Sequence, residues 1–354
     1  MSYTDKSPVN SQSQSRRDWT VPGLTLGLIA VIIIAFLIPE WLLNIFTISF
    51  ARALAVIGLL VLWRMGLVSF GHAFYYGLGA YTVAMVGKTF GVTDVAILIP
   101  SALIVSTVVG FLLGFILRNY REIFFAMLSL AFSMILYGIL VKTESLGSTD
   151  GFNVSSPTFF GFDFEETRNR RIALFIMLCF VGYISALCVH FYLRSALGQL
   201  TTAIRDNEIR VEYLGFSVAK AIHIKYTMSA ALAGLGGAVL ALTLNQVDPD
   251  SMVNWTSSGE LVFVTILSGT GSVAAPFIGS VIFDLIRTYA FEWAPHAWQL
   301  IVGTCLLLII FFLPGGVWSL LTMPFRRRSQ QPRSGGSIGG SSGVNSSVEE
   351  RGHE

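Results

Sequence analysis

The stretch VAILIPSALIVSTVVGFLLGFIL, residues 95–117, decides the fold class. It contains no charged side chain, and it is longer than the about 20 apolar residues that a helix needs to cross the hydrocarbon core of a bilayer. The rest of the chain has the same character, because 53% of its 354 residues are hydrophobic and only 12% are charged. Soluble domains carry about 25% charged residues. We therefore predict an integral membrane protein that lies in membrane lipid.

Apolar runs of this kind recur along the chain. The predicted membrane segments cover residues 24–38, 45–63, 69–86, 95–117, 123–141, 172–193, 226–244, 260–269, 273–286 and 298–314. The segments on either side of Gly269 and Gly271 are too short for an ordinary crossing helix. The sequence thus predicts an all-α, polytopic helical bundle of about ten membrane segments, in which some helices are short or broken.

Side chains at the segment ends predict the orientation. All seven tryptophans fall at or just beyond segment ends, as expected at headgroup depth. Ten crossings place both termini on one side, and that side collects most of the arginines and lysines, which favours the cytoplasm. Arg168, Arg170 and Arg171 fall on the opposite side and argue against this orientation. We predict a multi-pass protein of a bacterial inner membrane with both termini in the cytoplasm.

Composition divides the chain into three parts. Residues 1–20 form a polar, cytoplasmic N-terminal tail, and no small-residue cleavage site follows the first apolar run, so we expect that run to be retained. Residues 21–325 form the membrane domain, which includes a cytoplasmic loop at 194–225. Residues 326–354 are rich in Gly, Ser and Arg, and we expect a disordered cytoplasmic tail.

Short strings that resemble nucleotide-binding motifs do not have the context that those sites need. GKT at 87–89 lacks the first glycine of a phosphate-binding loop, because Thr82 stands there. GTGSVA at 269–274 follows an apolar helix rather than a strand of a βαβ unit. The three cysteines have neither metal-ligand nor redox spacing. We predict no catalytic residues, no metal site and, with a net charge of only +2, no nucleic-acid partner.

Polar residues inside apolar segments are the candidates for a translocation pathway, because broken helices leave backbone groups that must line a cavity or another helix. The candidates are Ser69, His72, Tyr76, Tyr81, Asp150, Ser268 and Thr270. We interpret His72 as a hydrogen-bonded packing residue, with titration or metal ligation as the alternative. Asp284 and Arg287 stand three residues apart on one helix, so we expect them to neutralise each other. Glycines three or four residues apart, as in AGLGGA at 233–238, predict close helix packing.

One charged stretch, RSALGQLTTAIRDNEIRVEYLG at residues 194–215, separates two apolar segments. It predicts a short amphipathic helix whose apolar side carries Leu197, Leu200, Ile204, Val211 and Leu214. Asp206 and Arg210 have the spacing of a helical ion pair. Such a helix can lie on a membrane or dock into a partner. The mixed charges favour a protein partner, since a membrane-binding helix would have a polar face rich in lysine.

This stretch resembles the conserved cytoplasmic loop of LivM-type permeases, which belong to the branched-chain amino acid ABC importers. The residues that match the loop and the helix after it are Ser195, Gly198, Ala203, Ile204, Arg205, Asn207, Glu208, Leu214, Gly215, Lys220, Ser229, Ala230, Ala233, Gly234 and Gly237. Further motifs of the family resemble GLVSFGHAFYYGLGAY at 66–81, STDGF at 148–152 and ILSGTGSVAAPFIGSVI at 266–282. The likeness covers almost the whole chain except its two tails.

The resemblance implies the permease subunit of an ATP-driven importer of branched-chain or related small amino acids. Its implied partners are a second, homologous permease subunit, two ATP-binding cassette ATPase subunits and a periplasmic solute-binding protein. The chain itself would bind no cofactor, because ATP is bound by the partner ATPases. The residues implied to couple the permease to the ATPases are Gly198, Ala203, Arg205, Asn207, Glu208, Leu214 and Gly215.

Two departures from the family pattern leave the substrate open. The family's Gly-Tyr-Ala-Gly-Gln run is replaced by residues 63–67, and its Thr-Gly-Gly element by residues 147–149. Related permeases act on urea, amides or aromatic acids, so these remain alternatives. An ion-coupled secondary transporter would need carboxylates deep in its segments, and only Asp284 is a candidate. A membrane-embedded enzyme would need a paired catalytic constellation, which we do not find in the sequence.

Overall fold

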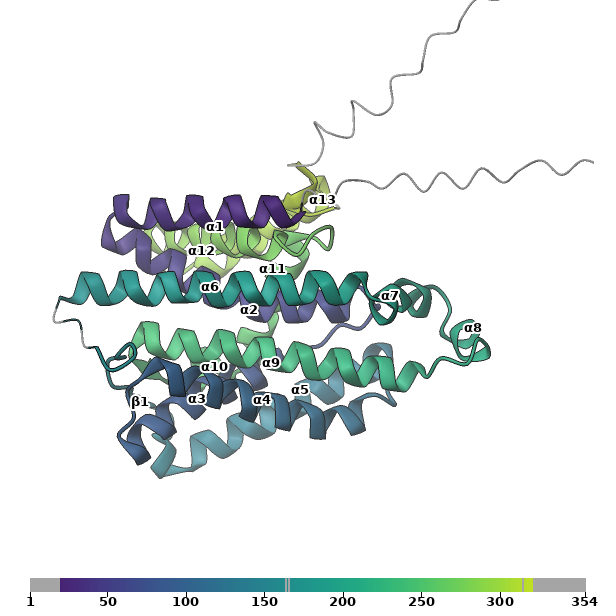
Figure 1. Ribbon diagram of the computed structural model, residues 1–354, viewed down its shortest axis with the longest axis horizontal. Coiled ribbons are helices and arrows are strands. Elements are labelled where there is room, and N and C mark those ends of the chain that lie inside the picture. Colours follow the sequence, from purple (N-terminus) through teal and green to yellow (C-terminus); the bar gives the residue numbers. More distant parts are fainter. Residues whose placement is uncertain (1–19, 163, 165, 314, 321–354) are drawn as a thin grey trace, which may run out of the picture.

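The computed structural model describes residues 20–162, 164, 166–313 and 315–320, and its long helices lie side by side in one bundle (Figure 1). The helices are α1 (Thr20–Leu37), α2 (Glu40–Trp63), α3 (His72–Phe90), α4 (Val95–Leu117), α5 (Glu122–Lys142), α6 (Thr167–Arg194), α7 (Ala196–Asp206), α8 (Glu208–Tyr213), α9 (Val218–Leu244), α10 (Pro249–Met252), α11 (Trp255–Ser268), α12 (Ala275–Trp293) and α13 (Trp298–Phe312). A 3₁₀ turn, η1 (Glu144–Leu146), and two short antiparallel strands, β1 (Phe152–Asn153) and β2 (Gln246–Val247), lie between them.

The ten predicted segments all correspond to helices, namely α1 to α6, α9 and α11 to α13. Helix α4 has the same bounds as the predicted segment at 95–117. The Asp94 carboxylate caps its first turn by accepting a hydrogen bond from the Ala96 amide. Six of the helices (α1, α2, α4, α5, α6 and α9) are long and apolar enough to cross a bilayer. The all-α, polytopic fold class is confirmed. The predicted tails at 1–20 and 326–354 lie outside the described residues, apart from Thr20.

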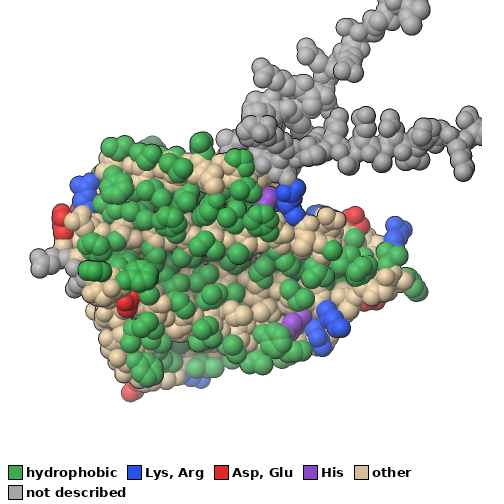
Figure 2. Space-filling view, viewed as in Figure 1, with side chains coloured by type: hydrophobic (Ala, Val, Ile, Leu, Met, Phe, Trp, Pro, Cys, Tyr) green, Lys and Arg blue, Asp and Glu red, His purple; other side chains and the backbone are tan. Residues whose placement is uncertain are grey.

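The surface of the bundle is apolar over its middle and charged at its ends. In Figure 2 hydrophobic side chains cover the long face, and charged side chains gather at the two ends. Helix α1 fully buries only Ala35, and the rest of its apolar side chains are exposed or only partly buried. Three tryptophans lie where headgroups are expected, since Trp63 ends α2, Trp293 ends α12 and Trp298 begins α13, whereas Trp255 begins α11 level with the middle of α5. This distribution fits a protein whose sides contact lipid.

The described ends of the chain lie at the same end of the bundle as α7 and α8, opposite β1 (Figure 1). We call this the α7 end, and the opposite one the β1 end. Arg168, Arg170 and Arg171, which opposed the predicted orientation, stand at the β1 end, where α6 begins. There Arg171 forms an ion pair of 3.1 Å with Glu40, so part of this positive charge is balanced locally.

Helix α9 forms the centre of the bundle, and it packs against α2, α3 and α4. The predicted close packing through small residues is confirmed here. A Cβ atom at Gly237 would overlap the carbonyl oxygen of Tyr76, and one at Gly79 would overlap the carbonyl oxygen of Gly234. Backbones that approach this closely gain dispersion contacts, which drive helix association in lipid.

Replacing Gly237 by leucine is expected to destabilise the folded bundle by about 1–3 kcal/mol, the usual effect of inserting atoms into a packed core. The new side chain would push α3 away from α9. Thermal unfolding of the purified protein in detergent measures the effect. Gly303→Leu is the matched control, because nothing lies within 4 Å of a Cβ atom at that site. Equal melting temperatures for the two variants would contradict the packing argument.

Two helices begin inside the bundle rather than at its surface. The third segment was predicted to start at Ser69, but α3 starts at His72. The preceding backbone is held out of the helix because the Ser69 and Ser129 hydroxyls accept bonds from the Gly71 and Phe70 amides, respectively. Helix α11 likewise begins deep, since the Val253 carbonyl just before it accepts a bond from Ser133, halfway along α5.

A break in the eighth segment was predicted near Gly269, and the chain does leave the helix there, but a second break, which lies deep in the bundle, separates the short helix α10 from α11. The 269–274 connection joins α11 to α12 at the α7 end, where Arg64, just after α2, bonds the Thr270 carbonyl. Gly269 has a φ of +80° and packs against Gly315, so this glycine serves a tight turn. The two deep starts, at α3 and α11, meet where the Ala73 amide donates to the Ser258 hydroxyl at 3.2 Å.

Candidate functional site

The charged stretch at 194–215 forms two helices rather than the single helix that was predicted. Ser195 caps α7 by accepting a bond from the Gly198 amide, and Asn207 caps α8 by accepting one from the Arg210 amide. Asn207 has an extended backbone with a φ of −164°, which separates the helices. The chain then turns at Gly215, whose φ of +86° favours glycine. Figure 1 shows α7 and α8 projecting beyond the end of the bundle.

The inner side of this element packs on the bundle, and its outer side is apolar as well as charged. Gly198, Ile204 and Val211 are buried, and a Cβ atom at Gly198 would overlap the Tyr192 carbonyl. Tyr213 and Leu214, in contrast, are 88% and 70% exposed. The predicted stripe is therefore correct for Ile204 and Val211 and wrong for Leu197 and Leu214, which are exposed; Leu214 lies beyond the break at Asn207, where the predicted helix does not continue. The coupling candidates Ala203, Arg205, Asn207 and Gly215 are exposed.

Two polar contacts fix the element to the bundle. The Lys225 ammonium on α9, which is fully buried, donates to the Thr201 hydroxyl on α7. Glu208, at the start of α8, pairs with Arg121 in the turn between α4 and α5, at 2.8 Å. The predicted Asp206–Arg210 pair spans the break at Asn207, so its helical spacing is lost. Any displacement of α7 or α8 would act directly on α9 and on the α4–α5 turn.

The polar candidates at the start of α3 lie in the interior of the bundle. Ser69 and His72 are buried, and the His72 Nε2 atom is 2.6 Å from the Ser229 hydroxyl of α9. The interpretation of His72 as a hydrogen-bonded packing residue agrees with this contact. Ser229 lies one helical turn after Lys225 on α9. The start of α3 is thus connected, through one turn of α9, to the contact that holds α7.

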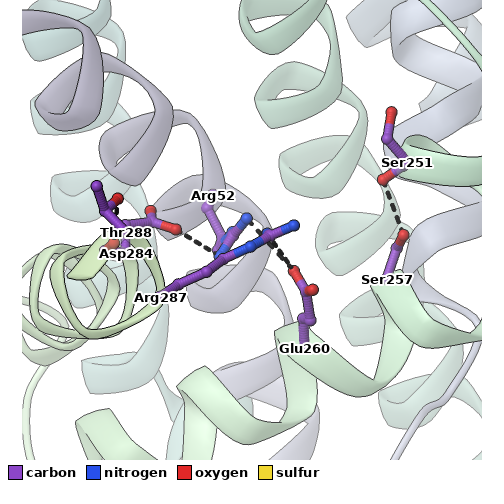
Figure 3. Close-up of polar contacts among 7 residues, drawn as sticks. All are labelled: Arg52, Ser251, Ser257, Glu260, Asp284, Arg287 and Thr288. Atoms are coloured by element: carbon purple, nitrogen blue, oxygen red, sulfur yellow. Dashed lines mark hydrogen bonds and ion pairs between the residues drawn. The ribbon is translucent and has the colours of Figure 1, made fainter. Parts of the chain in front are cut away.

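A cluster of four charged side chains, two of them buried and two partly exposed, joins α2, α11 and α12 (Figure 3). We call Arg52, Glu260, Asp284 and Arg287 the charge cluster. Arg52 contacts Asp284 at 2.6 Å and Glu260 at 3.4 Å, while Arg287 contacts Glu260 at 2.9 Å. The expected neutralisation of Asp284 by Arg287 is corrected, because each residue has a closer partner on another helix. Glu260 was missed from sequence, although a lone carboxylate opening an apolar run was a usable signal.

The other pathway candidates lie at different levels of the bundle and do not converge. Tyr76 is buried on α3. Tyr81 lines an apolar pocket of about 320 Å³ between α3, α5 and η1. Asp150 is exposed in the loop at the β1 end, and Ser268 and Thr270 lie at the α7 end. The sequence candidates therefore do not form one binding site.

Within the described residues, no group of three or more His, Cys, Asp or Glu side chains could hold a metal ion. The three cysteines are not paired in disulfides, and Cys179 is buried. The described polar groups instead connect helices to one another.

Comparison with known proteins agrees with this architecture. The family model for the permease component of branched-chain amino acid transport systems matches residues 41–311. The chain belongs to this family. The match runs from the start of α2 to the end of α13, and it includes the α7–α8 element, the charge cluster and both deep helix starts.

Individual relatives carry the same description. The high-affinity branched-chain amino acid transport system permease protein LivM of Salmonella typhimurium is 27% identical over 87% of this chain and 78% of its own length. LivM of Escherichia coli is 26% identical over 82% of this chain and 74% of its length. LivH of Escherichia coli, a second permease protein, is 20% identical over 78% of this chain and 94% of its length. No solved structure matches the chain significantly.

Proposed function

We propose that this protein is the permease subunit of an ATP-driven importer that moves branched-chain amino acids into the cytoplasm. The observation that carries the proposal is the α7–α8 element, which projects from one end of a lipid-exposed bundle and is fixed to α9 through Lys225 and Thr201. Burying the Lys225 ammonium costs desolvation free energy. A segment that merely covered the end of the bundle could pack through apolar side chains without this cost.

The exposed side of α7 and α8 is the proposed docking surface for the ATPase subunits, which bind the ATP. Tyr213 and Leu214 supply apolar contact area, and Arg205 adds charge. Aromatic residues and arginine at the centre of an interface contribute most of its binding free energy. The α7 end, which also carries both described chain ends, is then the cytoplasmic end of a bacterial inner-membrane protein.

The remaining partners follow from the family. LivM and LivH are both permease proteins of branched-chain amino acid transport, and this chain resembles both. We infer that it assembles with a second, homologous permease, and that a periplasmic solute-binding protein delivers the amino acid at the β1 end. The names of the relatives favour branched-chain amino acids over urea, amides or aromatic acids. An ion-coupled mechanism is disfavoured, because both carboxylates of the charge cluster, Asp284 and Glu260, are already paired with arginines.

Lys225→Met is expected to reduce ATP-driven uptake of L-leucine about tenfold or more in the importer reconstituted with its ATPases, second permease and binding protein. The substitution keeps the length of the side chain but removes the charge-assisted bond to Thr201, and a loss of about 1.4 kcal/mol is a tenfold effect. ATP hydrolysis should continue, but it should no longer respond to the loaded binding protein.

Lys220→Met is the matched control, because Lys220 is exposed on the same helix. It should leave uptake unchanged. If Lys225→Met transports at the normal rate with normally stimulated ATPase activity, then α9 is not linked functionally to the docking surface through this contact.

A further inference from the structure

Part of α11 is exposed at the level of the middle of the bundle. Thr256 is exposed, Gly259 has open space where a Cβ atom would stand, and Phe263 is 47% exposed. These residues recur every three to four positions and therefore share one side of the helix. Their depth is set by the Val253 carbonyl, which bonds Ser133 halfway along α5.

Charged groups of the cluster reach this same exposed side. Glu260 follows Thr256 by four residues, and its side chain is 23% exposed, while that of Arg287 is 39% exposed. Their partner Arg52 lies halfway along α2. Figure 3 shows the Arg52 and Arg287 side chains extending toward Glu260 from two other helices. A carboxylate and a guanidinium are thus accessible together at mid-membrane depth.

Lipid cannot cover such a surface. Hydrocarbon offers no hydrogen bonds to charged groups or to irregular backbone, so both occur at membrane depth only where protein or a water-filled cavity faces them. Glu260 and Arg287 supply accessible charge on this face, close to the deep start of α11. This surface therefore faces protein or water in the assembled importer, in contrast to the apolar sides of α1 and α4.

We propose that the Glu260–Arg287 pair is the mid-membrane contact for the zwitterionic head group of the transported amino acid, an inference that rests on the proposed function. The Glu260 carboxylate would accept from the substrate ammonium, and the Arg287 guanidinium would donate to the substrate carboxylate. Phe263, one turn after Glu260, offers an apolar surface to an aliphatic side chain.

The arrangement suits transient binding. Glu260 and Arg287 already neutralise one another at 2.9 Å, so an arriving zwitterion exchanges one pair of opposite charges for two. The Arg52 guanidinium also pairs with the Glu260 carboxylate, at 3.4 Å, so this carboxylate keeps a cationic partner during the exchange. The site can therefore bind and release substrate without leaving an unpaired charge in the membrane interior.

Cysteine accessibility in the intact importer tests this inference. Thr256→Cys and Gly259→Cys are introduced after Cys179, Cys188 and Cys305 have been replaced by serine or alanine, and the complex is treated with a membrane-impermeant, cationic methanethiosulfonate. Both sites are expected to react, whereas Ile104→Cys, exposed on the apolar side of α4, is expected not to react. Saturating L-leucine should protect both sites, but leucinamide and 4-methylpentanoate, which each lack one of the two charges, should not.

Glu260→Gln separates a binding role from a structural one. It is expected to raise the L-leucine concentration that half-protects Thr256→Cys about tenfold, because a charge-assisted bond to the ammonium is lost. Glu40→Gln, which alters the exposed Glu40–Arg171 pair, should leave protection unchanged. Unreactive cysteines, or protection that is equal for all three compounds, in a complex that still imports L-leucine with ATP would overturn this inference and leave the proposed function standing. A complex without ATP-driven uptake would overturn both.

Discussion

Replacing Arg52 by methionine is expected to destabilise the folded protein by about 3–5 kcal/mol, the usual cost of removing one partner from a buried ion pair. Arg52 contacts both carboxylates of the charge cluster, and the side chains of Arg52 and Asp284 are only 11% and 8% exposed. Without the guanidinium, Asp284 would lose its cation in the interior of the bundle. Thermal unfolding of the purified protein in detergent, at several protein concentrations, measures the loss.

Two further variants separate charge from shape. Arg171→Met removes a comparable cation from the exposed pair with Glu40, and it should change stability by no more than about 1 kcal/mol. Combining Arg52→Met with Asp284→Leu should recover much of the stability, since two apolar side chains can replace a buried ion pair. An Arg52→Met protein that unfolds like the wild type would mean that Arg52 does not join α2, α11 and α12 as described.

Gly215→Pro is expected to abolish ATP-driven uptake while leaving membrane insertion intact. Gly215 has a φ of +86°, and proline is confined to about −65°, so the turn between α8 and α9 cannot form. The α8 helix would then be displaced from its contact with Arg121. Uptake of L-leucine and the stimulation of ATP hydrolysis by the loaded binding protein are both measured in the reconstituted importer, alongside the amount of protein inserted.

A matched control lies at the β1 end of the bundle. Gly161 also has a positive φ, of +81°, and nothing lies within 4 Å of a Cβ atom at either glycine. Gly161→Pro therefore imposes the same backbone strain in a loop at the β1 end, away from the proposed docking surface. It should retain uptake. Glu208→Ala, which removes the pair with Arg121, should reduce uptake in the same direction as Gly215→Pro. Normal transport by both Gly215→Pro and Glu208→Ala would contradict the assignment of α7 and α8 to coupling.

The positions of the helices could be predicted because lipid imposes a local rule on the sequence. A segment that crosses hydrocarbon must be apolar along its whole length, and this is why residues 95–117 define α4 without further information. Tryptophans at segment ends are set by the same environment. Close packing at Gly237 was also predictable, because small residues on an apolar helix have few other uses.

Pairings between helices could not be predicted, because they depend on how distant segments meet. Arg52 and Asp284 are 232 residues apart in the sequence, whereas the local spacing favoured Asp284 and Arg287. The deep starts of α3 and α11 depend on serine hydroxyls of α5. The pattern of apolar residues contains no sign of these contacts, so the sequence predicted only the break near Gly269. The family resemblance identified the coupling stretch, but the break at Asn207 and the buried Lys225–Thr201 contact appear only in the structure.

We expect this protein to transport only as part of an ATP-driven assembly. The most direct measurement compares uptake of radiolabelled L-leucine into proteoliposomes that contain this chain alone with uptake into proteoliposomes that also contain the second permease and the ATPases, with the loaded binding protein outside. Uptake is predicted only for the full assembly with ATP, and it should be independent of proton and sodium gradients. Uptake by the chain alone, driven by an ion gradient without ATP, would instead identify a secondary transporter.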